Sequence, residues 1–294
     1  MATTFCRIHH LMTKNIEYQT SETGSQLPEI PQHWIVAGEQ VKPRVEEVPR
    51  ALVIRNVEHQ PGYYAPYHSH GRGQLMFISE GLIQVSAKDS GYWVVPPQRA
   101  VWIPSYIEHD ARTIHSVKMH NVYLAPEVTQ ELPDQCQVVT VTPLLRELIL
   151  ELSRLPLLYD ELGSDGRLVS VFLDQLKATP QAALHLPEPK SGGLKRITQA
   201  LRSKPENNDS IESWAANAGI SSRTLARRFQ DETGMTFSQW RQQARLLEAL
   251  TRIAAGIPIA TIAQDLGYSS QSAFIAMFRK ALGKTPAKYF DHKR

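Results

Sequence analysis

The chain has 294 residues, of which 42% are hydrophobic and 21% are charged, and its formal net charge is +3. This length favours two domains, and the composition excludes a disordered chain, a collagen and a disulfide-rich scaffold. The charge is unevenly divided: residues 190–294 hold 17 Lys and Arg against 8 Asp and Glu, a net +9, and the preceding residues hold 15 against 21, a net −6. A basic last third favours a nucleic-acid partner for the C-terminal part only.

The cysteines and the first residues indicate a compartment. Cys6 and Cys136 lie far apart and in no metal-ligand spacing, which is typical of a reduced cytosolic protein. Arg7, His9 and His10 stand where a signal peptide would need an apolar run. No stretch approaches the length of a membrane span. We therefore expect a soluble cytoplasmic protein with no membrane partner.

The first half of the chain changes from a polar segment to a β-rich one. Residues 1–45 are polar and contain Pro28, Pro31 and Pro43, which predicts a poorly ordered lead-in. Residues 46–140 instead hold short β-rich runs between Gly and Pro turn signals: LVIRNV, QLMFISEG, LIQVSA, GYWVVPP, AVWIP and HNVYLAP. Such a series predicts an antiparallel sandwich or a small barrel.

Residues 141–179 follow with a helical period. Leucines recur at helical spacing from Leu144 to Leu152, and a second apolar stripe runs from Leu168 to Leu176. These two predicted helices have two interpretations. Either they supply the surface of a homodimer, or they simply pack onto the barrel.

A linker and a helical region complete the chain. Residues 180–193 are rich in Pro and Gly, which is typical of a linker. Residues 194–294 read as helix and contain a weak internal repeat, IESWAANAGISSRTLARRF at 211–229 and IATIAQDLGYSSQSAFIAMF at 259–278. Each copy has an amphipathic helix, Ala-x-x-x-Gly, Ser-Ser and a second amphipathic helix that ends on Phe.

This repeat predicts two helix-turn-helix motifs. The small Ala lets the two helices approach closely, the Gly adopts the left-handed turn conformation, and a Ser caps the next helix. Between the copies, residues 237–255 predict a single helix of about 28 Å. That length is close to the ~34 Å between successive major-groove segments on one face of DNA. The spacing favours duplex DNA more strongly than the charge does.

The C-terminal region resembles the DNA-binding domain of the AraC/XylS family of bacterial transcription regulators. The stretches that carry the resemblance are SSRTLARRFQDETGMTF, WRQQARLLEAL and IATIAQDLGYSSQSAFIAMFRKALGKTPAKYF. The resemblance implies that the second helix of each motif enters the major groove of double-stranded promoter or operator DNA. The residues it marks as DNA-binding are Ser221, Ser222, Arg223, Thr224, Arg227, Arg228, Ser270, Gln271 and Ser272.

One position departs from the family pattern. Ala276 stands where many members carry an arginine that would match Arg227. The second motif would then contribute less base readout and more positioning on the DNA backbone. RNA polymerase is a further candidate partner of such a regulator.

The β-rich region resembles the cupin superfamily. The stretch GYYAPYHSHGRGQLMFISEG at 62–81 matches the first cupin motif, with Gln74 where that superfamily usually has Glu, and the looser second motif includes Pro104 and His109. The resemblance implies a cupin-like barrel, a common sensor in the AraC family. The expected fold class is therefore α+β: an N-terminal cupin-like antiparallel β-barrel with flanking helices, then an all-α domain of residues 194–294 with two helix-turn-helix motifs.

The histidines of the barrel suggest a ligand site. Residues two apart on a strand face the same side, so His68 and His70 point either both into the barrel or both out of it. Three imidazoles that converge with an amide oxygen suit a divalent transition metal such as Zn, Ni, Fe or Mn. Gln in place of Glu removes a negative charge and instead favours an organic ligand. The expected metal ligands are His68, His70, Gln74 and His109, and the expected effector pocket adds Trp102 to these four.

Two functions remain to be weighed at this point. The first is a transcription regulator, activator or repressor, whose activity a small molecule modulates from the barrel. The alternative is a metal-dependent cupin enzyme with a DNA-binding tail. The barrel motifs contain no paired carboxylates and no nucleophile–base constellation, and Glu80 and Glu108 are isolated. We therefore predict a regulator and no enzyme activity.

Overall fold

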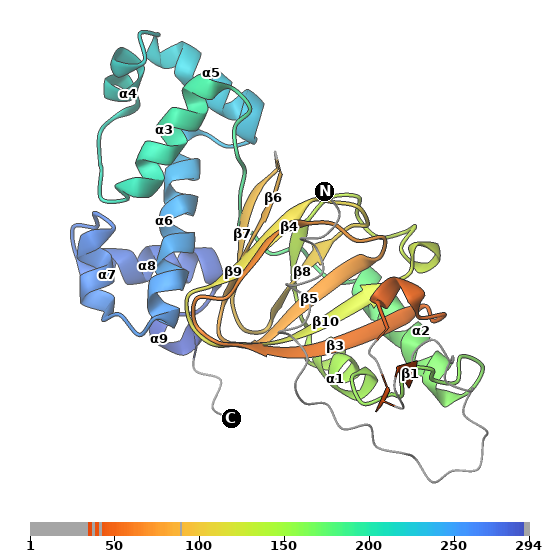
Figure 1. Ribbon diagram of the computed structural model, residues 1–294. Coiled ribbons are helices and arrows are strands. Elements are labelled where there is room, and N and C mark those ends of the chain that lie inside the picture. Colours follow the sequence, from red (N-terminus) through yellow and green to blue (C-terminus); the bar gives the residue numbers. More distant parts are fainter. Residues whose placement is uncertain (1–34, 37–38, 41–42, 89, 291–294) are drawn as a thin grey trace.

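The computed structural model describes residues 35–36, 39–40, 43–88 and 90–290. A two-sheet β-structure with two flanking helices is followed by a domain made of helices (Figure 1), which confirms the expected α+β class. The predicted lead-in of residues 1–45 lies almost entirely outside the described residues. Within it, β1 (Ile35–Val36) and β2 (Glu39–Gln40) pair with each other.

The barrel consists of two five-stranded antiparallel sheets. The first sheet has the order β11–β8–β5–β10–β3, formed by β3 (Leu52–His59), β5 (Gly73–Glu80), β8 (Arg99–Ile103), β10 (Val117–Leu124) and β11 (Gln137–Thr140). The second has the order β12–β7–β6–β9–β4, formed by β4 (Tyr64–His68), β6 (Ile83–Ala87), β7 (Gly91–Val95), β9 (His109–Thr113) and β12 (His185–Leu186). Short 3-10 turns lie at η3 (Val45–Glu47) and η4 (Pro126–Val128).

Strand β5 shows how one sheet serves two cores. Met76 and Ile78 pack between the sheets with residues of β6, such as Val85. Leu75 and Phe77 point to the other face, because successive side chains of a strand alternate. That outer face is covered by the buried sides of α1 (Pro143–Leu152) and α2 (Ser164–Lys177). The two helices therefore pack onto the barrel.

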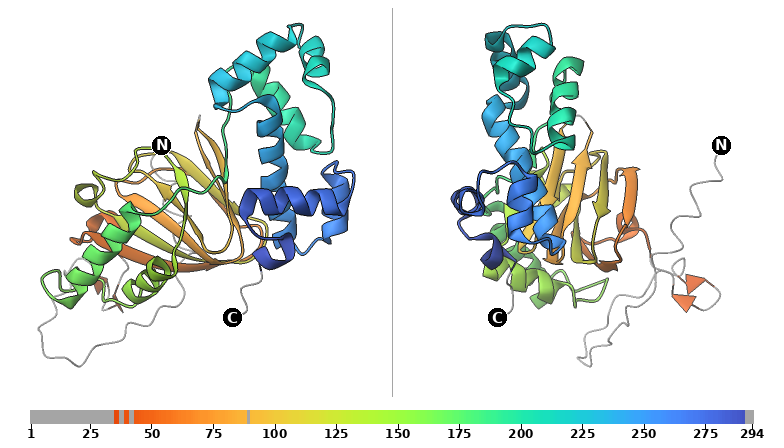
Figure 2. Two further views of the ribbon diagram at one scale, coloured as in Figure 1. Left: turned by 180° about the vertical axis from the view of Figure 1, so that it is seen from behind. Right: turned by 90° about the vertical axis from the view of Figure 1, so that its left-hand side faces the viewer.

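The C-terminal domain lies on the opposite side of the barrel, against the second sheet, so the sheets stand between two groups of helices (Figure 2). Its helices are α3 (Gly192–Ser203), α4 (Ile211–Asn217), α5 (Ser222–Thr233), α6 (Phe237–Ala254), α7 (Ile259–Asp265), α8 (Gln271–Leu282) and α9 (Pro286–Tyr289). The segment predicted to be a linker, 180–193, contains β12, which pairs with β7. None of the described helices is long and apolar enough to span a bilayer.

Candidate DNA-binding surface and effector site

The turn of each helix-turn-helix motif follows the same local chemistry. Gly219 and Gly267 have φ values of +67° and +74°, a conformation that glycine adopts without strain. The Ser221 hydroxyl then accepts the N–H of residue 224 at 3.2 Å, and the Ser270 hydroxyl accepts that of residue 273 at 3.1 Å. These bonds cap the second helix of each motif, α5 and α8. Both α5 and α8 therefore begin at a defined serine.

Buried aromatic and leucine side chains fix the inner face of these two helices. Leu225 and Phe229 are fully buried on the inner face of α5, and Phe274 and Phe278 are fully buried on the inner face of α8. The residues expected to contact DNA lie on the other side. Exposed residues are Ser221, Arg223, Arg227, Arg228, Ser270, Gln271 and Ser272, and the half-buried ones are Ser222 and Thr224.

The arginines of α5 are available for a partner. Within the described part of the chain, the side chains of Arg223 and Arg227 form no hydrogen bond and no ion pair. Counted from the two serine caps, Arg223 corresponds to Ser272 of α8, and Arg227 corresponds to Ala276. A guanidinium that has no partner in the protein can donate to a base edge or to a phosphate.

Helix α6 connects the motifs, and a buried arginine fixes them to each other. Arg245 of α6 donates from Nε to the Pro205 carbonyl at 2.7 Å and from Nη2 to the Asn207 carbonyl and Asn208 Oδ1, both at 3.0 Å. Asn208 Nδ2 in turn donates to the carbonyl of Gly267 at 3.0 Å. The loop before the first motif is thereby bonded to the turn of the second. Sequence reasoning missed Arg245, because its partners lie 37 to 40 residues away from it in the chain.

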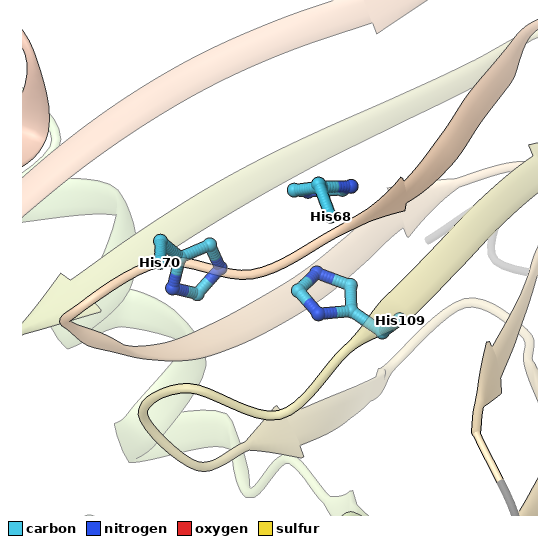
Figure 3. A group of neighbouring side chains, drawn as sticks. All are labelled: His68, His70 and His109. Carbon is cyan, nitrogen blue, oxygen red and sulfur yellow. The ribbon is translucent and has the colours of Figure 1, made fainter.

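The three histidines of the barrel come together at one end of the second sheet (Figure 3). His68 ends β4 and His109 begins β9, and the two are direct partners in the β4–β9 ladder. His70 follows in the loop after β4. One ring nitrogen from each histidine lies within 4.8 Å of the others. His109 is buried, His70 is half-buried and His68 is exposed, so the cluster opens towards solvent.

Each of these histidines is oriented by a backbone carbonyl. The Nδ1 atoms lie 2.8, 2.5 and 2.9 Å from the carbonyl oxygens of Pro66, Arg72 and Ile107, for His68, His70 and His109 respectively. A carbonyl only accepts, so Nδ1 carries the proton and Nε2 keeps its lone pair. Metal-binding histidines in proteins commonly show this arrangement, with the second nitrogen donating to a carbonyl.

The innermost histidine fits a ligand role best. His109 Nε2 is buried and has no hydrogen-bond partner among the described residues. Burial lowers the pKa of His109 to about 4, against a smaller opposing effect of its bond to the Ile107 carbonyl. The ring is therefore neutral near pH 7 and can offer Nε2 to an electron-pair acceptor. These observations fit the divalent transition metal expected from the sequence.

Gln74 lies in the site and contacts two further polar residues. Its Oε1 is 2.9 Å from His70 Nε2, and its Nε2 donates to Asn121 Oδ1 at 2.9 Å and to the Tyr123 hydroxyl at 3.3 Å. An amide can donate to the Asn121 oxygen, which a glutamate carboxylate cannot do, so the glutamine suits its neighbours. Asn121 and Tyr123 were missed. The alternation of β10 could have identified them, since they share a face with inward-pointing Met119.

Trp102 is separated from the histidines. It belongs to the core between the first sheet and α1 and α2, whereas its strand neighbours Val101 and Ile103 point between the sheets. Its indole Nε1 donates to the Pro133 carbonyl at 2.8 Å. A Cβ at Gly73 would lie 2.2 Å from the indole, so Gly73 leaves room for the ring. The structure therefore gives Trp102 a packing role and not the expected place in the pocket wall.

Comparisons with known proteins agree with both halves of the chain. The helix-turn-helix domain family matches residues 214–292, and the family of AraC-like ligand binding domains matches residues 52–176. The chain is 35% identical over 225 residues to the HTH-type transcriptional regulator NimR of Escherichia coli, covering 76% of this chain and 82% of NimR. It is 32% identical over 119 residues to the HTH-type transcriptional regulator RipA of Corynebacterium glutamicum, covering 40% of this chain and 34% of RipA.

Among solved structures, ToxT from Vibrio cholerae aligns with 82% of this chain and 98% of its own, at 11% identity and a TM-score of 0.35. That similarity is too weak to support an argument. The similarity to NimR extends over most of both chains, and both relatives are transcriptional regulators. The chain belongs to the AraC family of transcriptional regulators, with an AraC-like ligand-binding domain followed by a helix-turn-helix DNA-binding domain.

Proposed function

We propose that α5 and α8 read adjacent major-groove segments on one face of operator DNA, and that a ligand held by the barrel histidines controls this binding. One observation supports the DNA-binding part of this proposal. Two serine-capped helices with exposed polar residues, α5 and α8, lie on either side of α6 in the chain. Helix α6 has 18 residues, which corresponds to about 27 Å. Successive major-groove segments are ~34 Å apart, so one chain can reach both.

A fixed distance between the motifs supports this reading. The bonds from Arg245 to the loop before α4, and from Asn208 to Gly267, join the two motifs into one unit. A rigid unit loses little freedom when its second motif follows the first onto DNA. Base readout is expected from Arg223 and Arg227, and phosphate contacts are expected from Arg228 and the cap serines.

Selection of genomic fragments by the full-length protein at moderate salt tests the proposed sequence-specific DNA binding. The proposal expects enrichment of one sequence class over bulk DNA, with a strongly conserved block read by α5 and a weakly conserved block about one helical turn away read by α8. Enrichment of a single block with no preference beside it would remove base readout by α8. No enrichment at any salt concentration would remove sequence-specific binding altogether.

For the effector site we propose a divalent transition metal, of the Zn, Ni, Fe or Mn type, bound through the Nε2 atoms of His68, His70 and His109. The proposal is supported by the three Nδ1–carbonyl contacts and by the unpartnered Nε2 of His109. Gln74 is the proposed fourth ligand, because its Oε1 lies 2.9 Å from His70 Nε2 and both are acceptor atoms that one metal ion can bind. The bound metal would supply an electron-pair acceptor that draws β4 and β9 together.

Elemental analysis and calorimetry with Ni²⁺ test the proposed metal binding by the histidine site. Wild type is expected to bind one Ni²⁺ for each chain, and His109→Ala is expected to weaken binding at least 100-fold. His115→Ala is a matched control, because His115 is outside the cluster. Equal affinity of His109→Ala and wild type would contradict the proposed site.

A homodimer is part of the same proposal, with RNA polymerase as a further partner of the DNA-bound form. Leu144 of α1 and Val171 of α2 remain 52% and 44% exposed although both helices pack on the barrel. These exposed side chains support a dimer surface on the outer face of α1 and α2. Leu144→Asp with Val171→Asp is expected to convert a dimer into a monomer in sedimentation. A wild-type monomer at micromolar concentration would contradict the dimer.

We do not propose an enzyme. Glu80 and Glu108 form exposed ion pairs with Lys118 and Lys88, at 3.1 and 3.0 Å respectively. Neither carboxylate faces the histidine cluster in this arrangement. The regulators NimR and RipA also favour control of transcription.

A further inference from the structure

Strand β9 has one face on the histidine site and the other on the DNA-binding domain. His109, Ala111 and Thr113 are buried and belong to the inward face. Arg112 and the following Ile114 are exposed at the barrel surface and line the cleft between the barrel and the helical domain. The alternation of a strand thus places His109 and Arg112 on opposite faces of the same strand.

The outward face reaches the DNA-binding domain through one glutamine. Arg112 and Gln84 of β6 are direct partners in the sheet, and Arg112 Nε donates to Gln84 Oε1 at 2.9 Å. The other end of the amide, Gln84 Nε2, donates to Thr251 Oγ1 on α6 at 3.2 Å. Arg112 therefore orients the amide so that its NH₂ group faces α6.

Other contacts hold the same two surfaces together. The Arg202 guanidinium of α3 lies over the Tyr92 ring of β7, 4.3 Å from its centroid. Gln243 of α6 donates to the carbonyls of Ala183 and His185 in the segment that enters the helical domain, at 2.7 and 3.1 Å. A cleft of about 560 Å³ remains between the surfaces, and Gln84, Tyr92, Arg112, Arg202 and Thr251 all line it. The contact thus combines polar bonds with apolar packing and leaves an unfilled cleft, and domains within one chain commonly move relative to each other across interfaces of this kind.

The histidine site lies on the inward face of the same strand, β9. His68 and His109 are partners across β4 and β9, with ring centroids 4.4 Å apart. A ligand that joins these two rings fixes the start of β9. Arg112 is three residues further along the same strand, about 10 Å away at the rise of a β-strand.

We propose that Arg112 and Gln84 are positioning residues through which the histidine site controls the docking of the DNA-binding domain on the barrel. This inference rests on the proposed function, in which the histidines hold a metal. A ligand at His68 and His109 stabilises the β4–β9 pair, and the pair in turn holds Gln84 towards Thr251. Because coupling is reciprocal, a docked domain also raises the affinity of the histidine site for its ligand.

Hydrogen exchange of full-length protein with Co²⁺ as the probe tests this coupling. The visible absorption of Co²⁺ reports occupancy of the histidines, and exchange of residues 244–251 reports docking of α6. In wild type, Co²⁺ is expected to slow exchange of this segment at least threefold. In Gln84→Ala, Co²⁺ is still expected to bind, weakened by no more than the factor by which it slows exchange in wild type, while less than half of that slowing remains.

Two further variants separate coupling from a general loss of structure. Thr251→Val keeps the shape of the side chain but removes the acceptor, and it should behave like Gln84→Ala. Gln181→Ala is the control, because Gln181 is exposed and has no side-chain hydrogen bond among the described residues. Full slowing by Co²⁺ in both Gln84→Ala and Thr251→Val would overturn this inference and leave the metal site intact. Failure of wild type to bind Co²⁺ would overturn the metal proposal together with the inference that rests on it.

Discussion

The two helix-turn-helix motifs have the same internal construction. In each motif, a glycine in the left-handed conformation joins the two helices, and a serine caps the second helix, which has 12 residues. Each second helix also ends at a left-handed glycine, Gly234 with φ +69° and Gly283 with φ +76°. The residues that hold the motif together are therefore repeated almost position by position.

The solvent-facing residues of the same motifs differ. At positions equivalent from the serine caps, α5 presents Arg223 and Arg227, and α8 presents Ser272 and Ala276. An arginine can bond two acceptors of a guanine, which a serine or an alanine cannot do. The two motifs thus share one backbone structure but present different surfaces to DNA. We expect α5 to make most of the base contacts and α8 mainly to position the protein on the DNA backbone.

The largest effect is expected from Arg227→Ala. It should weaken binding to the selected operator by about 1–3 kcal/mol and relax specificity at one base pair, because a bidentate contact to a base is lost. Arg154→Ala, which removes an exposed arginine of the barrel region, is the control. A changed salt dependence with unchanged specificity would identify Arg227 as a phosphate contact.

Ala276→Arg tests the difference between α5 and α8 by a change in α8. It places in α8 the residue that α5 has at the equivalent position. On operators with guanine at the facing position, binding should strengthen by about 1–2 kcal/mol, because one base contact is added. Competition among operators randomised in the second block measures this gain. Equal strengthening on all sequences would mean that the new arginine contacts only phosphates.

Loss of either cap should affect the two motifs equally. Ser221→Ala and Ser270→Ala each remove a bond to a helix N–H, so each should lower the free energy of unfolding by about 1 kcal/mol. Urea denaturation of the full chain measures both. Ser269→Ala is the control, since Ser269 precedes the cap. A cost confined to one variant would show that the motifs are not equivalent in construction.

The smallest effect is expected from Gln271→Ala. Gln271 is exposed at the first position of α8, and loss of a single contact there should cost less than about 1 kcal/mol of DNA binding. Titration of wild type and variant on the same operator measures the difference. A loss as large as that of Arg227→Ala would contradict the unequal roles assigned to the two helices.

The motifs could be predicted because their signals are local. Gly219, Ser221 and the apolar spacing of α5 all lie within about a dozen residues, so the sequence contains the whole structural reason. The sequence left open which serine of each pair, Ser221–Ser222 or Ser269–Ser270, caps the second helix. The structure uses Ser270, three residues after Gly267, whereas Ser221 follows Gly219 by two.

The barrel site was only partly predictable, because its neighbours come from distant strands. The resemblance to the cupin motifs suggested His68, His70 and His109, but alternation along one strand does not account for His70, which lies in the loop after β4. Asn121 and Tyr123 join the site only because β10 pairs with β5, a contact between residues nearly fifty positions apart. Both faces of β8 are apolar, so alternation alone could not tell whether Trp102 faces the pocket or the helices.

Hydroxyl-radical footprinting of the full-length protein on its selected operator tests the central claim most directly. If α5 and α8 of one chain read adjacent major-groove segments, each chain should protect two segments on one face of the DNA, about 10 base pairs apart. Arg227→Ala should weaken protection of only one of them. A single protected segment for each chain, or equal loss of both segments in Arg227→Ala, would contradict the account.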